Sequence, residues 1–417
     1  MNRDLWRVFG RIGLLSFGGP AAQIALMHRE LVENRHWLTE DQFLRALSFC
    51  MLLPGPEAMQ LATYAGWKRA GIIGGLIGGG LFVIPGALVI AALALSYGAY
   101  GGLPVVQSLF LGVKATVVII VIEALIRIAK RALIAPAHLV IAGLAFVALF
   151  VLALPFPLVI GMAALAGAML QRDHTGASTA PPANLMGSLR VIVIGGIIWF
   201  APLVPIALAG DEFLLDVGGF FAKLAVVTFG GAYAVLAYMT QEVVVSYGWL
   251  TTAQMMDALG LAETTPGPLI LVTQFVGMTA GLADGGMGRA LIAGALTLWM
   301  TFVPCFIWIF AGAPLIDWLD GRPRLRGALA AITAAVVGVI ANLSLWFALH
   351  VFFGTVNPLH WGPVRSIWPD LTTAQPAAIG LACLAGVLLL IRHWPLPLVL
   401  LTTGLASLGA AMISGAI

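Results

Sequence analysis

The sequence predicts an all-α polytopic membrane protein made of two inverted-topology repeats with re-entrant broken-helix hairpins. Three observations support this fold class. Apolar residues make up 61% of the chain and charged residues only 9%, whereas a soluble domain carries about 25% charged residues. A set of helix-breaking motifs recurs 212 positions later in the chain. The two copies of one loop also differ in basic charge, which indicates opposite faces of a membrane.

The apolar segments are long enough for a chain that crosses a membrane many times. Stretches such as Ile72 to Tyr97, Val191 to Ala209 and Leu396 to Met412 can span a hydrocarbon core of about 30 Å. In order, the expected segments are 5–27, 42–66, 71–99, 103–131, 136–154, 156–171, 187–209, 216–240, 254–282, 288–313, 325–353, 376–392 and 395–416. The three cysteines lie inside such segments without metal-like spacing, so we expect no metal and no cofactor.

The repeated motifs keep one spacing over the first two segments of each half. Ser16-Phe17-Gly18-Gly19-Pro20 matches Thr228-Phe229-Gly230-Gly231-Ala232, and Pro54-Gly55-Pro56 matches Pro266-Gly267-Pro268. Around them, Arg11, Glu30 and Trp37 match Lys223, Glu242 and Trp249. We therefore expect a first repeat at 1–171, a linker and connecting transmembrane helix at 172–215, and a second, inverted repeat at 216–417.

Loop charge gives the expected orientation. The stretch after the first motif holds Arg29, Arg35 and Arg45, whereas 240–257 holds no Lys or Arg. Because cytoplasmic loops are enriched in basic residues, the two copies should face opposite sides. The basic N-terminus, Arg35 and the pair at 68–69 can all be cytoplasmic only if 5–27 and 42–66 enter the membrane and return. This layout has about nine full crossings plus about four re-entrant elements; full spanning by those two segments is the alternative.

The glycine and proline motifs should interrupt the helices and open an anion site. Proline lacks an amide hydrogen and glycine tolerates unusual dihedral angles. Broken backbone inside a membrane is tolerated only where it is buried in protein or lines a cavity. Each break should begin a new helix, whose first amides and dipole favour an anion. A proline kink with a purely structural role is the alternative for any single break.

Ionisable residues at matched positions extend this hypothesis. Arg11 and Lys223 precede the first break of each half, and they could recruit an anion or simply extend to the membrane interface. Lys114 and Glu123 share one apolar segment and are candidates for proton or charge coupling. Glu123 could instead pair with Arg127, four residues later. We expect Glu30, Trp37, Glu242 and Trp249 to hold the hairpins in place.

The expected substrate-binding residues follow from the breaks and their flanking charges. They include Gln60, which the second copy replaces with Val272. The complete set is Arg11, Ser16, Phe17, Gly18, Gly19, Pro54, Gly55, Pro56, Gln60, Lys223, Thr228, Phe229, Gly230, Gly231, Pro266, Gly267 and Pro268.

The motif set resembles the signature of the chromate ion transporter (CHR) family, in its long two-domain form. The resemblance rests on 16–20, Glu30, Trp37-Leu38, 54–56, Gly66 and Phe82 to Pro85, with a second copy from Thr228 to Pro268. It implies export of chromate from the cytoplasm and chromate resistance, with sulfate as the natural competitor. The second copy departs from the first at Ala232, Leu269 and Val272, which leaves the anion contacts of that half open.

The alternatives are a passive oxyanion channel, a sulfate transporter and a membrane enzyme. The apolar segments contain no HExxH motif, no nucleophile–base motif and no P-loop, so we expect no enzymatic activity. The expected partners are chromate or sulfate and the lipid bilayer, with a homodimer as a further option and no nucleic acid. The expected location is the bacterial inner (plasma) membrane, crossed many times.

Overall fold

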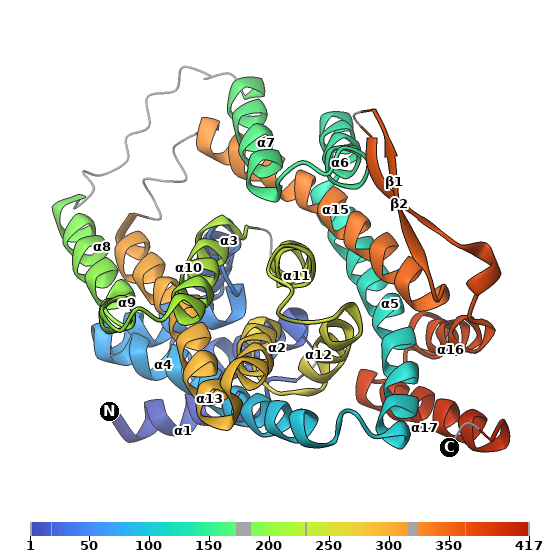
Figure 1. Cartoon of the computed structure of the whole chain (residues 1–417). Coiled ribbons are helices and arrows are strands. Elements are labelled where there is room, and N and C mark those ends of the chain that lie inside the picture. Colours follow the sequence, from blue (N-terminus) through green and yellow to red (C-terminus); the bar gives the residue numbers. More distant parts are fainter. Residues whose placement is uncertain are drawn as a thin grey trace. The chain divides into compact units, whose positions relative to one another are not determined.

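The computed structural model is built almost entirely of helices (Figure 1) and describes residues 2–17, 19–171, 185–229, 232–315, 323–362 and 364–415. The α-helices are α1 Asn2–Leu15, α2 Gly19–His28, α3 Glu40–Leu52, α4 Glu57–Tyr100, α5 Pro104–Ala132, α6 Pro136–Phe150, α7 Phe156–Leu170, α8 Leu185–Phe200, α9 Leu203–Leu208, α10 Glu212–Val227, α11 Ala232–Thr240, α12 Thr252–Thr264, α13 Val272–Gly312, α15 Pro323–Phe352, α16 Pro376–Gly386 and α17 Leu396–Ile413. The π-helices are η1 Arg29–Asn34, η2 Gln241–Ser246 and η6 Val387–Ile391, and short 3-10 turns lie at Leu269–Leu271, Ala313–Leu315 and Leu371–Thr373.

The helical membrane architecture expected from the sequence is confirmed. Among the described residues, five helices are long and apolar enough to cross a membrane, and they cover 57–100, 104–132, 269–312, 324–352 and 396–413. Shorter apolar helices cover 136–150, 156–170, 185–200 and 376–391. One element was not expected: β1 Val356–Trp361 and β2 Val364–Pro369 pair as an antiparallel hairpin. The expected linker falls largely on 172–184, outside the described residues.

Elements of the two halves correspond closely. The π-helices η1 and η2 and the helices α3 and α12 begin and end 212 positions apart. Helices α5 and α15 begin at Pro104 and Pro323, which lie 219 positions apart. Pro85 and Pro304, inside α4 and α13, have the same separation. Helices α6 and α7 correspond to α16 and α17, and the prolines that begin them (Pro136 and Pro376) lie 240 positions apart. The hairpin accounts for this last shift, because it lengthens only the link between α15 and α16.

The matched Trp-Leu-Thr tripeptides make the same turn into a helix. The Trp37 amide donates to Leu31 O at 2.8 Å, and the Trp249 amide donates to Val243 O at 2.9 Å. Two residues later Thr39 caps α3, with its side chain accepting from the Gln42 amide. Thr251 accepts from the Gln254 amide at 3.2 Å in the same way. The sequence repeat thus encodes a capped helix start in both halves.

The long helices α4 and α13 are each a tight pair of antiparallel arms. Their non-helical dihedrals fall at Ala70–Gly71 in α4 and Gly285–Gly286 in α13, and both second glycines have positive φ (62° and 77°). The arms of α4 touch through backbone: a Cβ atom on Gly74 would lie 2.1 Å from Gly66 O. Only glycine permits such a turn and such an approach.

Two compact units divide the chain, and each draws on both halves of the sequence. Unit 1 comprises 1–95, 173–235 and 261–325, and unit 2 comprises 96–172, 236–260 and 326–417. In unit 2, α16 and α17 pack beside α5 (Figure 1). Helix α7 packs on α15, because a Cβ atom on Gly167 would lie 2.2 Å from Gly327 O. The last helices of each half therefore pack on a helix of the other half.

We predict that Gly74→Ala lowers stability while Gly80→Ala does not. Both changes add a methyl group within α4, but a Cβ atom on Gly80 would meet nothing closer than Ile84 Cδ1 at 3.9 Å. Overpacking at Gly74 should cost about 1–3 kcal/mol of unfolding free energy. Thermal unfolding of the purified protein, followed by tryptophan fluorescence, measures the difference. Equal stability of the two variants would contradict the close approach of the arms.

Candidate functional site

The helix breaks meet in crossed pairs inside unit 1. The Gly55 amide of the first half donates to Thr228 O of the second half at 3.2 Å, and the Gly267 amide of the second half donates to Ser16 O of the first half at 2.9 Å. Gly55 and Gly267 are matched positions, as are Ser16 and Thr228. The two hydrogen bonds are therefore one contact made twice, with the halves exchanged.

The glycines of the breaks adopt conformations that other residues avoid. Gly19, Gly55 and Gly267 have φ of 76°, 110° and 89°. The space around two of them is also restricted. A Cβ atom on Gly55 would lie 2.8 Å from Cys305 Sγ, and one on Gly267 would lie 3.2 Å from Leu271 Cδ1 and 3.3 Å from Phe82 O. Glycine is thus required at these breaks both by dihedral angle and by packing.

Gln23 joins one of the crossed pairs and was not foreseen from the sequence. Its side chain is 2% exposed, and its Nε2 donates to Gly267 O at 2.7 Å and to Ser16 O at 3.2 Å. The second half has Val235 at the matched position, so only one pair carries this bridge. The available signal was a carboxamide side chain inside an apolar segment, five residues after the first motif glycine, Gly18.

Ser16 and Thr228 are buried and use their hydroxyls locally. Ser16 Oγ donates to Ile12 O at 2.5 Å, and Thr228 Oγ1 donates to Leu224 O. Each hydroxyl satisfies a carbonyl in the last turn of the helix before the break. Both hydroxyl hydrogens are therefore engaged with the backbone. The next residue after Ser16, Phe17, is 45% exposed. Gly18, Gly230 and Gly231, which belong to the same motifs, lie outside the described residues.

The Pro-Gly-Pro segments are largely buried, and the first is braced by Gln60. Pro54, Pro56, Pro266, Gly267 and Pro268 are buried, and Gly55 is half-buried. Gln60 is fully buried, and its Nε2 donates to Pro54 O at 2.7 Å. Its Oε1 has no hydrogen-bond partner among the described residues. Because that oxygen can only accept a hydrogen bond, Gln60 braces the break and offers an anion no donor beyond its engaged amide.

Two residues that were assigned separate roles form an ion pair. Arg11 Nη1 lies 3.5 Å from Glu30 Oε1, with the arginine side chain 63% exposed and the glutamate side chain 5% exposed.

The remaining predicted residues of the hairpins differ in burial. Lys223 is exposed, and Phe229 and Glu242 are half-buried. Trp37 packs on Phe9 with ring centroids 6.0 Å apart, and Trp249 stacks on Tyr247 at 4.3 Å.

The coupling candidates Lys114 and Glu123 have different partners, both within unit 2. Lys114 Nζ lies 3.3 Å from Asp257 Oδ1, with side chains 19% and 6% exposed, and the Tyr97 hydroxyl donates to Asp257 Oδ2 at 2.8 Å. Glu123 pairs with Arg127 at 2.5 Å, the self-neutralising alternative considered from the sequence. Asp257 was missed, although a carboxylate in the apolar segment 254–282, at the position matched to Arg45, was a signal for it.

We predict that Gln23→Leu destabilises the fold while Gln107→Leu does not. The first change removes the donor that bridges Ser16 O and Gly267 O, which leaves Gly267 O buried without that partner. Such a loss costs about 1–3 kcal/mol. Gln107 is exposed on α5, so the same substitution there removes no buried contact. Thermal unfolding of both variants measures the effect, and an unchanged midpoint for Gln23→Leu would argue against the bridge.

Comparison with known proteins identifies the family. The model of the Chromate_transp family, chromate transporter, matches residues 3–168 and 215–408. The chain is 32% identical over 347 residues to a chromate transport protein of Cupriavidus metallidurans, covering 82% of this chain and 81% of the relative. It is 30% identical over 349 residues to a probable chromate transport protein of Synechococcus elongatus, covering 82% and 83%.

A third relative, a chromate transport protein of Pseudomonas aeruginosa, is 30% identical over 348 residues and covers 82% of this chain and 80% of its own length. No solved structure matches the chain significantly. The family match extends over both halves, including all four helix breaks. This multi-pass membrane protein belongs to the chromate transporter family.

Proposed function

We propose that the chain is a secondary transporter that moves chromate out of the cytoplasm and takes the oxyanion at its paired helix breaks. The observation that carries this proposal is the exchange of backbone hydrogen bonds between Gly55 and Thr228 and between Gly267 and Ser16. A transporter needs a central site at which two related halves meet. The names of the family and of the three relatives favour chromate as the substrate.

Helix starts, more than the break glycines themselves, are the proposed anion donors. The Gly55 and Gly267 amides already donate to carbonyls. A helix follows each break, at Gly19, Glu57, Ala232 and Leu269, and its first amides have no partner within the helix. Glu57 puts a carboxylate in the first turn of α4, whereas the first turns of α2 and α11 hold none. We therefore place the oxyanion at the starts of α2 and α11, with Arg11 and Lys223 recruiting it.

The inverted arrangement of the two repeats is part of the proposal. Helices α3 and α12 have 13 residues each, about 20 Å of rise, which is short of a hydrocarbon core of about 30 Å. Arms of this length favour re-entrant hairpins that meet near mid-membrane, alongside about nine full crossings. The basic loop at Arg35 and its uncharged counterpart at Tyr247 favour opposite faces for the two hairpins.

The membrane potential can drive export of a dianion. Moving one charge through 100 mV is worth about 2.3 kcal/mol, so a dianion leaving an inside-negative cell gains about twice that amount. We accordingly propose that the protein lies in the plasma membrane and that chromate resistance is the physiological result, with sulfate competing for the site. The buried ion pair of Lys114 and Asp257, with Tyr97 donating to the carboxylate, is the proposed place for coupling to a proton.

We predict that Arg11→Gln and Lys223→Gln each lower oxyanion flux about tenfold or more. Each change removes a charge that would form a charge-assisted hydrogen bond, worth about 1.5–3 kcal/mol. Arg7→Gln is the matched control, because Arg7 is exposed one turn earlier on α1. Uptake of chromate and sulfate into inside-out vesicles, with and without a membrane potential, measures the flux.

The same vesicles separate the alternatives. Flux at the wild-type rate in both variants would remove these cations from the site. A current that rises with concentration without saturation would indicate a channel in place of a carrier.

If Asp257 couples a proton, Asp257→Asn should abolish any response of uptake to an imposed pH gradient. A response as large as in the wild type would exclude Asp257 from coupling.

We predict that cysteines at Arg35 and Tyr247 label from opposite faces of the membrane. The two positions match across the halves, and both residues are exposed. The exposed Cys383 is first replaced with serine, so that a membrane-impermeant maleimide reports only the introduced thiol. Right-side-out and inside-out vesicles each give one accessible position if the topology is inverted. Labelling of both positions from the same face would contradict the proposed inverted arrangement.

A further inference from the structure

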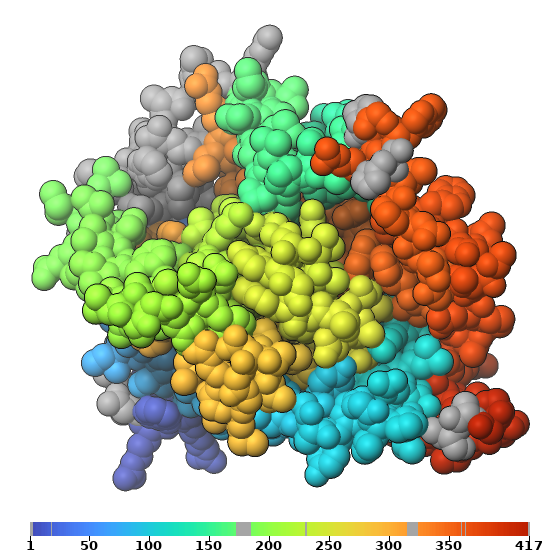
Figure 2. Space-filling view, viewed as in Figure 1, coloured from blue at the N-terminus to red at the C-terminus, as the bar shows by residue number. Residues whose placement is uncertain are grey.

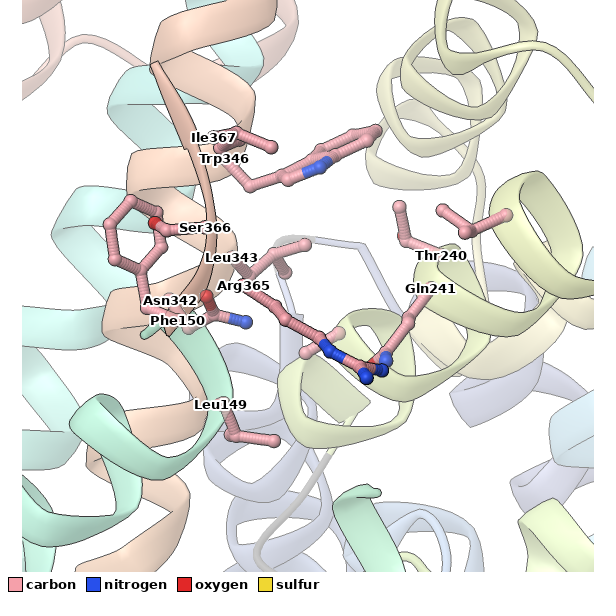
Figure 3. Close-up of a pocket in the computed structure, with 12 residues that line it drawn as sticks. Leu149, Phe150, Thr240, Gln241, Asn342, Leu343, Trp346, Arg365, Ser366 and Ile367 are labelled. Carbon is pink, nitrogen blue, oxygen red and sulfur yellow. The ribbon is translucent and has the colours of Figure 1, made fainter. Parts of the chain in front are cut away.

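We propose that unit 2 contains a second oxyanion-binding site, in a cavity whose mouth carries Arg365. The cavity has a volume of about 200 Å³, well above the about 30 Å³ that one water occupies in the liquid. It is lined by α6, the junction of α11 with η2, α15 and strand β2 (Figure 3). None of its lining residues belongs to the helix breaks, so the proposal does not depend on the function proposed for them.

Three polar side chains of the cavity carry hydrogen-bond donors that no acceptor among the described residues engages. Arg365, Gln241 and Asn342 line it, and none of the three has a side-chain hydrogen bond or ion pair with another described residue. Figure 3 shows the Arg365 guanidinium extending from β2 toward the Gln241 side chain. A guanidinium with five donors beside two carboxamides suits a group that offers several acceptor oxygens and negative charge.

Thr240 is an independent indication of a ligand. The residue is 2% exposed and lines the cavity, and its Oγ1 has no hydrogen-bond partner among the described residues. Buried polar atoms are rarely left unpaired, because the loss of hydration is costly. Thr240 also stands where α11 passes into the π-helix η2, a backbone feature frequent at functional sites.

The hairpin that supplies Arg365 occurs in one half only. Leu133–Ala135 alone separate α5 from α6, whereas 353–375 separate the matched α15 and α16. The Arg365 amide donates to Val151 O at 2.8 Å, which fixes β2 beside the end of α6. The hairpin reaches the surface seen in Figure 2 (orange-red, upper right), and its Trp361 and Trp368 are 80% and 64% exposed. The insertion therefore brings one cation to the cavity and two aromatic rings to the surface.

The shared ligand chemistry is a tetrahedral oxyanion, from either of two sources. A free anion such as sulfate or chromate would use the donors alone. The phosphate of a lipid headgroup would use them too, while its acyl chains lie along apolar lining residues such as Phe150, Leu149 and Ile367. Exposed tryptophans on the hairpin suit the membrane interface that both sources reach.

The test is equilibrium binding to the purified full chain. In a phosphate-free detergent, radiolabelled sulfate binding is compared among the wild type, Arg365→Gln, Asn342→Leu and the control Arg392→Gln, an exposed cation of unit 2 outside the cavity. In parallel, native mass spectrometry counts phosphatidylglycerol molecules that remain bound. Arg365→Gln should weaken one binding component about tenfold or more, as expected for one charge-assisted hydrogen bond, and Arg392→Gln should not.

Each outcome decides between the possibilities. Loss of a sulfate component in Arg365→Gln identifies a free oxyanion, and loss of a retained phosphatidylglycerol identifies a lipid phosphate. Asn342→Leu should weaken the same component, which keeps the test decisive if one variant fails to fold. Sulfate and phosphatidylglycerol binding that is the same in all four proteins would overturn the proposal.

Discussion

The crossed backbone hydrogen bonds between the helix breaks are the constraint on which unit 1 depends. A break exposes amides and carbonyls that water cannot satisfy in a membrane. Here the Pro-Gly-Pro glycine of one half supplies the donor, and the Ser/Thr break of the other half supplies the acceptor. In this chain each copy therefore completes the interrupted backbone of the other.

This exchange explains the glycine and small-residue pattern around the breaks. Two helices and two loops approach within backbone contact, so a side chain at Gly55, Gly86 or Gly267 would collide with a neighbour or strain the chain. Glycines also permit close packing in unit 2, where Gly112 lies against the backbone of α17 and Gly167 lies against the backbone of α15. In a membrane, where helices gain little from burying apolar surface, such close contact supplies the packing energy.

Sequence reasoning predicted the elements that depend on local chemistry. The breaks at 16–20 and 54–56 and the helical membrane class follow from glycine, proline and apolar runs. The sequence did not predict which residues these elements contact in the folded chain. Pairing of Gly55 with Thr228, the bridge from Gln23 and the ion pair of Lys114 with Asp257 join residues far apart in the chain. A single sequence carries no periodic signal for such contacts, and the hairpin at Val356–Pro369 is too short and aromatic to separate from an interfacial loop.

The positions at which the two halves differ are those that can give transport a preferred direction. In the inverted arrangement proposed above, chemically identical halves would give the inward and outward states equal free energy. This chain differs between halves at Gln23 and Val235, at Glu57 and Leu269, and at Arg45 and Asp257. The first difference stiffens one crossed pair, the second places a carboxylate at one helix start, and the third exchanges an exposed arginine for a buried acid. In the transporter proposed above, each difference would change the free energy of one state relative to the other by charge or hydrogen bonding. A ligand shifts such a balance only by its differential affinity for the two states.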